Sequence, residues 1–221
     1  MKIHIVISGL NEKMSKQKIL CFGDSHTYGF DPHHFQRYRH PWPTVLQSLM
    51  KNSVVYAEGL NGRSIQFDDP LIKGKNGMKS LPKILLKHPY MDVIIVMLGT
   101  NDLRLVFHAQ MEEIIDGMKR MISLIQRYQP QAAILLISPP PLRKEVAFSM
   151  WKDDFDDTCY QASLQLANAY KEVAKTCACH FLDAAKYVQA SPYDCVHMSE
   201  EDHAVFARVV YEQFFSNKEK A

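Results

Sequence analysis

No hydrophobic run in the 221-residue sequence is long enough to cross a membrane, which takes about 20 consecutive apolar residues in a helix. An excess of charge of one sign is missing too, because 26 Lys and Arg residues are nearly balanced by 24 Asp and Glu residues. The sequence also lacks a basic stripe interleaved with aromatic residues. These absences argue against a membrane-spanning protein and against nucleic acid as a partner.

Cysteine is scarce, and its five copies follow no pattern that a disulfide framework would need. An odd number leaves at least one thiol unpaired. Cys177 and Cys179 make a Cys-x-Cys pair, but no second pair has the spacing of a zinc site. We therefore expect reduced thiols, no metal centre and a cytoplasmic location.

Internal repeats, low-complexity tracts and linkers are absent as well, so nothing divides the chain into parts. At this length, and with 47% hydrophobic residues, the chain can bury one substantial core. We expect a single domain over residues 18–217, preceded by an extension over residues 1–17 that is either disordered or an added strand. The apolar stretch at residues 3–10 lacks a small-residue cleavage site, which argues against a secretory signal.

Short apolar runs alternate with longer amphipathic segments along the chain. The runs, partly β-branched, are typical of buried strands and cover residues 19–22, 54–57, 93–98, 134–137 and 181–182. Apolar residues at helical spacing mark residues 42–50, 111–128, 158–174 and 200–215. Strands that alternate with helices form a parallel sheet covered on both faces. The sequence therefore predicts a three-layer α/β domain with a central, mostly parallel sheet of about five strands.

Polar or glycine-rich turns follow the predicted strands. The first strand ends in "GDSH" and the second leads into "EGLNGRSI". The third ends in "GTND", and "DCVHMS" precedes the last predicted helix. Because the carboxyl ends of parallel strands meet at one edge of the sheet, where open α/β sheets bind ligands, we expect these turns to lie close together.

The side chains in these turns suit acyl transfer through a serine. The hydroxyl of Ser25 is a poor nucleophile until a base removes its proton, and the imidazole of His197 titrates near neutral pH. Asp194 can hold the other ring nitrogen and stabilise the imidazolium. The N–H groups of Ser25 and Gly62 and the carboxamide of Asn101 can donate hydrogen bonds to an oxyanion. Nucleophile, base, orienting carboxylate and oxyanion hole are all available.

Four of these turns, taken in chain order, resemble the sequence blocks of the SGNH (GDSL-type) hydrolases. They are Gly-Asp-Ser with Ser25, "GLNGRS" with Gly62, "LGTNDL" with Asn101, and Asp-x-x-His with His197. The resemblance covers residues 19–210 and is strongest with bacterial arylesterase-like members, which have motifs similar to "PWPTVL", "ISPPPL" and "FLDA".

The resemblance implies a flavodoxin-like fold and ester hydrolysis without metal or cofactor. It implies Ser25 as nucleophile, His197 as base and Asp194 as its orienter, with Gly62 and Asn101 as oxyanion donors. Some arylesterase-like relatives also transfer acyl groups to alcohols or peroxide, and several form oligomers. Acyl transfer and a homo-oligomer therefore stay open for this chain.

Two positions depart from the family pattern. His26 stands where the family often has the leucine of its name, and Cys195 replaces a common glycine before the base. Neither change removes a reacting group, but both alter the surroundings of the site.

Other classes of protein use some of the same residues. Asp24-x-His26 at a strand end, followed later by Asn101-Asp102, is similar to the opening of a two-metal phosphoesterase, but the later histidine-rich blocks of that family are missing. The loop "GDSHTYGF" has some character of a phosphate-cradling loop in a flavin-binding module, which leaves the Asp-x-x-His block unexplained. Among hydrolases, a lysophospholipase or thioesterase is the alternative to an esterase.

The remaining polar residues near the blocks are expected to be structural. Asp24 and Asp102 should hydrogen-bond backbone turns. His203, which follows His197 on the last predicted helix, should be a packed, hydrogen-bonded histidine and not a second base. The histidines of the early loop are expected at the surface: His33, His34 and His40.

Aromatic and apolar side chains are concentrated in the loops expected to flank the site. They are Tyr28, Phe30, Phe35, Trp42, Phe107, Phe148, Met150, Trp151 and Phe155. Ligand pockets are mostly apolar with few polar guides, so the sequence predicts a small uncharged ester with a short acyl group and an alcohol that can be aromatic. A thioester and a sugar acetate stay open.

Overall fold

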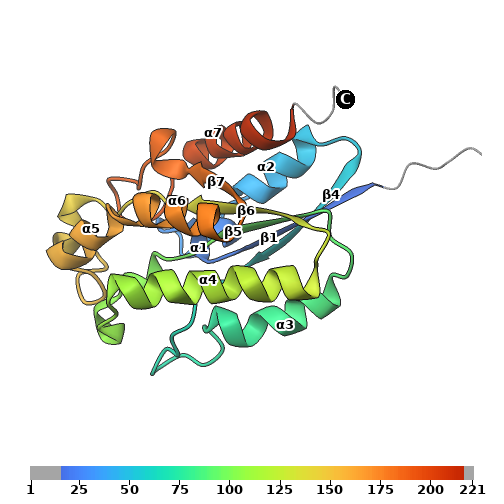
Figure 1. The fold of residues 1–221 in the computed structure, drawn as a ribbon. Coiled ribbons are helices and arrows are strands. Elements are labelled where there is room, and N and C mark those ends of the chain that lie inside the picture. Colours follow the sequence, from blue (N-terminus) through green and yellow to red (C-terminus); the bar gives the residue numbers. More distant parts are fainter. Residues whose placement is uncertain (1–15, 217–221) are drawn as a thin grey trace, which may run out of the picture.

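The computed structural model of the protein describes residues 16–216. Its centre is a sheet of five parallel strands in the order β4-β1-β5-β6-β7, which is the order of flavodoxin-like folds (Figure 1). The strands are β1 (Gln17–Gly23), β4 (Ser53–Gly59), β5 (Val93–Met97), β6 (Ala133–Ser138) and β7 (His180–Asp183). The predicted three-layer α/β fold with about five strands is confirmed.

Helices cover both faces of this sheet (Figure 1). One face packs against α2 (Trp42–Leu49) and α7 (Glu200–Val210). The other packs against α3 (Gly77–Lys87), α4 (Met111–Tyr128) and α6 (Leu166–Thr176). The connections contain the short helices α1 (Ser25–Tyr28) and α5 (Asp157–Ser163) and the antiparallel pair β2 (Phe30–Asp31) and β3 (Gln36–Arg37). None of the helices in the described range is long and apolar enough to cross a membrane.

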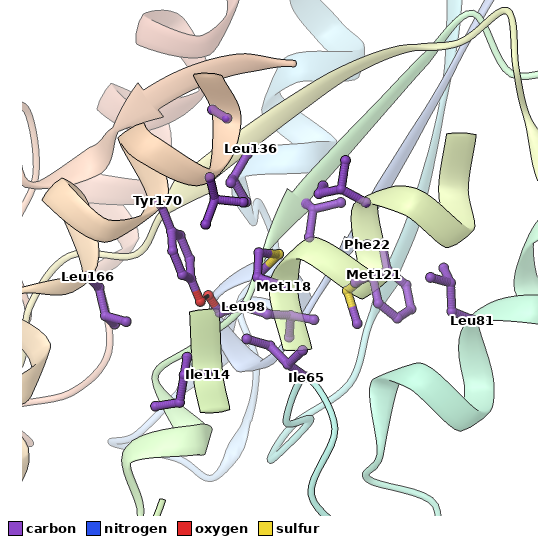
Figure 2. Close-up of a cluster of buried hydrophobic side chains, with 14 of the residues drawn as sticks. Phe22, Ile65, Leu81, Leu98, Ile114, Met118, Met121, Leu136, Leu166 and Tyr170 are labelled. Carbon is purple, nitrogen blue, oxygen red and sulfur yellow. Dashed lines mark hydrogen bonds between the residues drawn. The ribbon is translucent and has the colours of Figure 1, made fainter. Parts of the chain in front are cut away.

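The alternation of side chains along each strand divides the core into two clusters. Leu20 and Phe22 of β1 face the α3–α4–α6 side, whereas Ile19 and Cys21 face the α2–α7 side, and all four are fully buried. Figure 2 shows the first cluster, in which strand residues meet the apolar stripe of α4 and the ring of Tyr170 from α6. A strand that is buried on both faces consists of consecutive apolar residues. For this reason the strands could be predicted from the sequence.

Several boundaries differ from the predicted ones. The helix predicted over residues 158–174 is interrupted between α5 and α6, where Gln165 N–H donates to the carbonyl of Ala162, a tighter 3₁₀-type bond. The helix predicted over residues 200–215 changes to a π-type turn at Tyr211–Phe215. The helix α3 was not predicted. Of the extension predicted over residues 1–17, residues 1–15 lie outside the described range, and Gln17 already belongs to β1.

The end of β4 contacts α1 at Gly59. A Cβ atom at this position would lie 2.2 Å from the backbone nitrogen of Tyr28 and 2.6 Å from the carbonyl carbon of Thr27. Both separations are far shorter than a van der Waals contact, so only glycine lets α1 pack this closely on the strand.

We expect Gly59→Ala to push α1 away from β4 and to lower the free energy of unfolding by about 1–3 kcal/mol, the usual range for overpacking. Urea unfolding followed by circular dichroism measures the change. Ala57→Ser adds one atom at an exposed position of the same strand and is the matched control. Equal stability of Gly59→Ala and the wild type would contradict the close packing.

His203 on α7 is buried between α7 and the start of α2. Its Nδ1 accepts a hydrogen bond from the N–H of Trp42 (3.3 Å), and its ring packs edge-on against Tyr38. Burial, with a smaller effect from the charge of His197, lowers the pKa of His203 from its ordinary value of 6.5 to about 3. The predicted packed, hydrogen-bonded histidine is confirmed.

This burial makes folding stability depend on pH in a definite direction. Between pH 6.5 and about 3 the unfolded chain binds a proton at His203 that the folded protein does not bind, so this residue removes stability as the pH falls through that range. We expect His203→Asn, which keeps an acceptor for Trp42, to reduce that loss by up to about 1.4 kcal/mol for each pH unit below about 6. Denaturant unfolding at several pH values gives the slopes.

The slope is compared between the variant and the wild type, because other buried groups titrate in the same range. His40→Asn changes an exposed histidine and should leave the slope unchanged. A slope in His203→Asn equal to that of the wild type would show that His203 gains a proton as readily in the folded protein as in the unfolded chain.

Candidate active site

Ser25 is the first residue of α1, directly beyond the carboxyl end of β1. The carboxylate of Asp24 accepts a hydrogen bond from the N–H of His26 (3.0 Å) and caps this short helix. The strand order reverses beside β1, since the chain continues to β4 on one side of it and to β5 on the other. Open α/β sheets bind ligands at such a switch point, and Ser25 occupies it.

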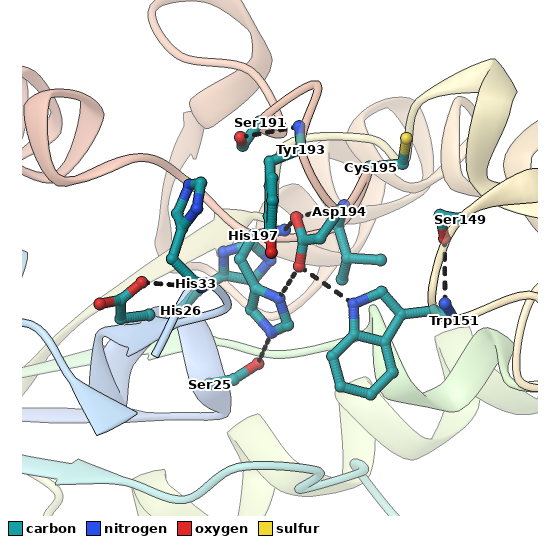
Figure 3. A network of polar contacts seen from close by, with 12 residues as sticks. Ser25, His26, His33, Ser149, Trp151, Ser191, Tyr193, Asp194, Cys195 and His197 are labelled. Atoms are coloured by element: carbon teal, nitrogen blue, oxygen red, sulfur yellow. Dashed lines mark hydrogen bonds and ion pairs between the residues drawn. The ribbon is translucent and has the colours of Figure 1, made fainter. Parts of the chain in front are cut away.

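Ser25, His197 and Asp194 form one continuous hydrogen-bonded chain (Figure 3). Nε2 of His197 lies 2.9 Å from Oγ of Ser25, and Nδ1 of the same ring lies 2.5 Å from Oδ2 of Asp194. With Nδ1 donating to the carboxylate, Nε2 is free to accept the serine proton. The fold thus brings Ser25, near the start of the domain, together with Asp194 and His197, which lie near its end in the sequence.

The carboxylate of Asp194 is fully buried and is surrounded by donors. Its Oδ1 accepts the backbone N–H groups of Val196 (3.2 Å) and His197 (3.0 Å), and its Oδ2 accepts Nε1–H of Trp151 (3.0 Å). Burial by itself raises the pKa of Asp194, but the hydrogen bonds and the charge of His197 outweigh it and hold the pKa below its ordinary value. Asp194 is therefore a carboxylate that fixes the orientation of the His197 ring.

A cavity of about 240 Å³ opens beside Ser25 and His197. Its walls include the aromatic residues Phe30, Trp151 and Phe155, as the sequence predicted. Other aromatic residues that were predicted to flank the site do not line the cavity. Trp42 is in the core, and Phe35 and Phe148 are exposed. The remaining walls combine the apolar side chains of Ile72 and Val196 with Gly62 and with polar or charged residues, which are Asn61, Asp69, Lys75, Asn101, Arg104 and Asp154.

Gly62 and Ser25 each present a backbone N–H near this cavity. Gly62 has a φ of +75°, in the left-handed region that glycine adopts without strain. Among residues 16–216, no acceptor takes up the N–H of Ser25 or of Gly62. Both N–H groups are therefore available to a ligand.

Asn101 begins the 3₁₀ turn after β5 and also lines the cavity. Its Nδ2 lies 3.2 Å from the carbonyl oxygen of Arg63 and 3.3 Å from Oδ2 of Asp24. Both hydrogen bonds are long for N–H···O contacts. The carboxamide thus points toward the region between Ser25 and the Gly62 turn. The sequence predicted that these three residues lie close together.

A charged network forms one wall of the cavity, and sequence reasoning did not find it. Arg104 bonds Oδ2 of Asp69 through Nη1 (2.5 Å) and Oδ1 of Asp154 through Nη2 (2.6 Å). The carboxyl of Asp69 is also held by the N–H groups of Leu71 and Ile72. These residues lie in three separate loops, and no local pattern in the sequence links them.

The two departures from the family pattern lie beside the reacting groups. His26 is buried, with its ring centroid 5.6 Å from that of His197, and burial lowers its pKa well below the ordinary value, so it stays neutral. Cys195 has a φ of +67°, a left-handed conformation that a glycine would adopt more easily. The backbone geometry thus explains why this position suits glycine.

Asp24 and Asp102 hydrogen-bond backbone N–H groups, as predicted. Asp24 binds the N–H of His26, and Asp102 binds that of Ile65 (2.8 Å). Within the described range, no three His, Cys, Asp or Glu side chains are grouped so that they could hold a metal ion. The early-loop histidines are exposed, also as predicted: His33, His34 and His40.

Comparisons with known proteins identify the family of the chain. The sequence model of the GDSL-like lipase/acylhydrolase family matches residues 21–205. No curated protein sequence matches the chain. A carbohydrate acetylesterase family member from Sinorhizobium meliloti is 32% identical, with a TM-score of 0.81 over 89% of this chain and 96% of that one.

Two further similar structures are those of an aryl esterase and of a putative arylesterase. The native M. smegmatis aryl esterase is 29% identical, with a TM-score of 0.80 over 89% of this chain and 97% of its own. A putative arylesterase from Agrobacterium tumefaciens is 32% identical, with a TM-score of 0.80 over the same shares of the two chains, 89% and 97%. The chain therefore belongs to the GDSL-like lipase/acylhydrolase family, as its four sequence blocks predicted, and is an enzyme that hydrolyses ester bonds.

Proposed function

We propose that this enzyme is a serine esterase that hydrolyses small carboxylic esters through an acyl-serine at Ser25. The observation that carries the proposal is the hydrogen-bonded chain from Ser25 through His197 to Asp194, which ends at the wall of a cavity. A serine hydroxyl within 2.9 Å of a histidine nitrogen, itself bound to a buried carboxylate, is the arrangement that activates a serine for attack.

In the proposed reaction, Oγ of Ser25 attacks the ester carbonyl while Nε2 of His197 accepts its proton. The tetrahedral intermediate then expels the alcohol, which takes the proton from His197 and leaves the acyl group on Ser25. Water, deprotonated by the same nitrogen, then attacks the acyl-serine and forms a second tetrahedral intermediate. Its bond to Oγ of Ser25 breaks, Oγ takes the proton back from His197, and the carboxylic acid leaves. Asp194 stabilises the imidazolium in both halves of the reaction and keeps its proton on Nδ1.

The oxyanion of each tetrahedral intermediate needs donors that are already in place. The N–H groups of Ser25 and Gly62 are available, and Asn101 supplies a third donor when one of its two long hydrogen bonds is exchanged for the oxyanion. Each such donor is worth roughly 3–4 kcal/mol of transition-state stabilisation. Acyl transfer to an alcohol or to peroxide uses the same acyl-serine and differs only in the attacking group.

The cavity favours a compact substrate. Its volume of about 240 Å³ is below the range of about 300–1,000 Å³ that holds drug-sized ligands. We therefore propose an acetyl or other short acyl group. An aryl alcohol fits the aromatic walls formed by Phe30, Trp151 and Phe155. A sugar acetate is the second candidate, because Asn61 and Asp154 offer hydrogen-bonding groups on the other walls.

The assigned roles predict a graded series of losses. Ser25→Ala and His197→Ala should each lower kcat by about 10⁴-fold or more, and Asp194→Ala by roughly one to two orders of magnitude less, because the orienting carboxylate does not carry the proton. Steady-state hydrolysis of p-nitrophenyl acetate measures kcat. The matched control is Ser48→Ala, an exposed serine on α2, which should keep wild-type activity.

A loss at Asp194 as large as that at His197 would contradict the role assigned to Asp194. Retained activity in Ser25→Ala would contradict the nucleophile. An organophosphonate, which forms a stable adduct with an activated serine, should appear by mass spectrometry on the peptide that contains Ser25, and unlabelled protein would count equally against the proposal.

The size of the cavity predicts the acyl preference. In a series of p-nitrophenyl esters from acetyl to dodecanoyl, kcat/KM should be highest for acetyl or butyryl and should fall steadily with longer chains, because the cavity cannot enclose them. Comparison of phenyl acetate with an acetylated sugar then ranks the two candidate alcohols. A preference for long chains would refute the short-acyl substrate and favour a lysophospholipase.

A further inference from the structure

The turn that contains Gly62 is a β-turn formed by residues 60–63. The N–H of Arg63 donates to the carbonyl of Leu60 (3.0 Å), and the φ of +75° at the third residue, Gly62, is that of a type II turn. Types I and II differ mainly by a flip of the central peptide, which here joins Asn61 to Gly62. Glycine at the third position is compatible with both types, so the sequence of the turn alone does not fix this peptide.

The ends of the turn are anchored to β1 independently of its central peptide. The N–H of Leu60 donates to the carbonyl of Gly23 (3.1 Å), and the guanidinium of Arg63 donates to the same carbonyl (2.7 Å). These contacts hold residues 60 and 63 but leave the orientation of the peptide between Asn61 and Gly62 undetermined.

Lys75 supplies the contact that the central peptide otherwise lacks. Its ammonium group donates to the carbonyl oxygen of Asn61 at 2.6 Å. Its aliphatic stem passes over Gly62, since a Cβ atom built there would lie 3.7 Å from Cε and 3.8 Å from Cδ of the lysine. In the described part of the chain, no carboxylate lies within ion-pair distance of this ammonium. Its contact with the turn is therefore not a by-product of a salt bridge.

The backbone of Lys75 is fixed to the same turn. The N–H of Ser64, the residue that follows the turn, donates to the carbonyl of Lys75 (3.0 Å), and the N–H of Gly77 donates back to the carbonyl of Ser64 (2.9 Å). Ser64 and Asn76 thus form a short parallel bridge at the start of α3. Lys75 is held at both ends, and its side chain spans the turn from residue 64 back to residue 61.

The carbonyl that Lys75 binds belongs to the same peptide group as the N–H of Gly62. Because a trans peptide is planar, its C=O and N–H point in opposite directions, and fixing one fixes the other. A cation on the carbonyl oxygen also polarises the peptide and makes its N–H a stronger donor.

We propose that Lys75 is a positioning residue that locks the peptide between Asn61 and Gly62, so that the N–H of Gly62 is directed and strengthened as an oxyanion donor. This inference rests on the proposed function, because it assigns a role to the donor that the esterase reaction uses. Lys75 acts through the peptide and does not itself touch the reacting atoms.

Lys75→Met tests the proposal, since it keeps the apolar stem over Gly62 and removes the ammonium. We expect kcat for p-nitrophenyl acetate to fall about tenfold to a hundredfold, while KM changes less than about threefold. This fall in kcat does not exceed the fall caused by removing a whole oxyanion donor, because the N–H of Gly62 is still present. The inhibition constant of a trifluoromethyl ketone, whose adduct with Ser25 carries an oxyanion, should rise by the same factor as kcat falls. Lys75→Arg, which keeps a cationic donor, should lie between Lys75→Met and the wild type.

Lys73→Met is the matched control, because Lys73 is an exposed lysine of the same loop that does not line the cavity, and it should behave as wild type. A kcat for Lys75→Met within about twofold of wild type would overturn the proposal. A rise in KM at unchanged kcat would also overturn it, by showing that the ammonium binds the substrate. If Lys75→Met does not fold, Lys75→Leu, which also keeps an apolar side chain and has no donor, is judged by the same criteria. Failure of the proposed function would be seen separately, as the absence of a phosphonate adduct on Ser25 in the unmutated enzyme.

Discussion

The burial of the Asp194 carboxylate is the constraint on which the site depends. A carboxylate with no exposure to water is tolerated only when donors replace its hydration. Here the donors come from the next turn of its own loop, from the His197 ring and from Trp151 in a distant loop. Satisfying one buried charge therefore places the base, fixes its tautomer and holds an aromatic wall of the cavity in position at the same time.

The sheet supplies the second level of organisation. Ser25, Gly62 and Asn101 follow β1, β4 and β5, which are neighbours in the sheet, and each leaves its strand within a few residues of the carboxyl end. Short, rigid connections then limit how far these groups can move: α1 is pressed against Gly59, and the hydroxyl of Tyr170 donates to the carbonyl of Leu98 just before the Asn101 turn (3.1 Å). The site residues therefore lie in short segments that pack against the core at the carboxyl edge of the sheet, and not in long loops without such contacts.

Much of this could be predicted from the sequence, because the informative features are local. Buried parallel strands read as apolar runs, and each site block directly follows a strand or precedes a helix. The start of the last helix is local in the same way, since Ser199 and Asp202, three residues apart, form the reciprocal pair of a capping box. What escaped prediction depends on pairings between distant segments. Helix α3 contains Pro82, which weakens its helical pattern, and packing against α4 maintains it. Arg104 and Lys75 gain their roles only when three loops meet, so no spacing along the chain identifies them.

The short bridge between Ser64 and Asn76 turns residues 65–75 into an excursion whose two ends are tied together. Asp69 and Ile72, at the wall of the cavity, belong to this excursion, whereas the nucleophile and its base do not. Changing the length of a segment with fixed ends costs little conformational entropy. Lys75, at the end of the excursion, contacts the turn that contains Gly62 and ties that end to the hydrolytic centre. The residues before Lys75 can be resized or rewritten to admit different substrates while the hydrolytic centre keeps its shape.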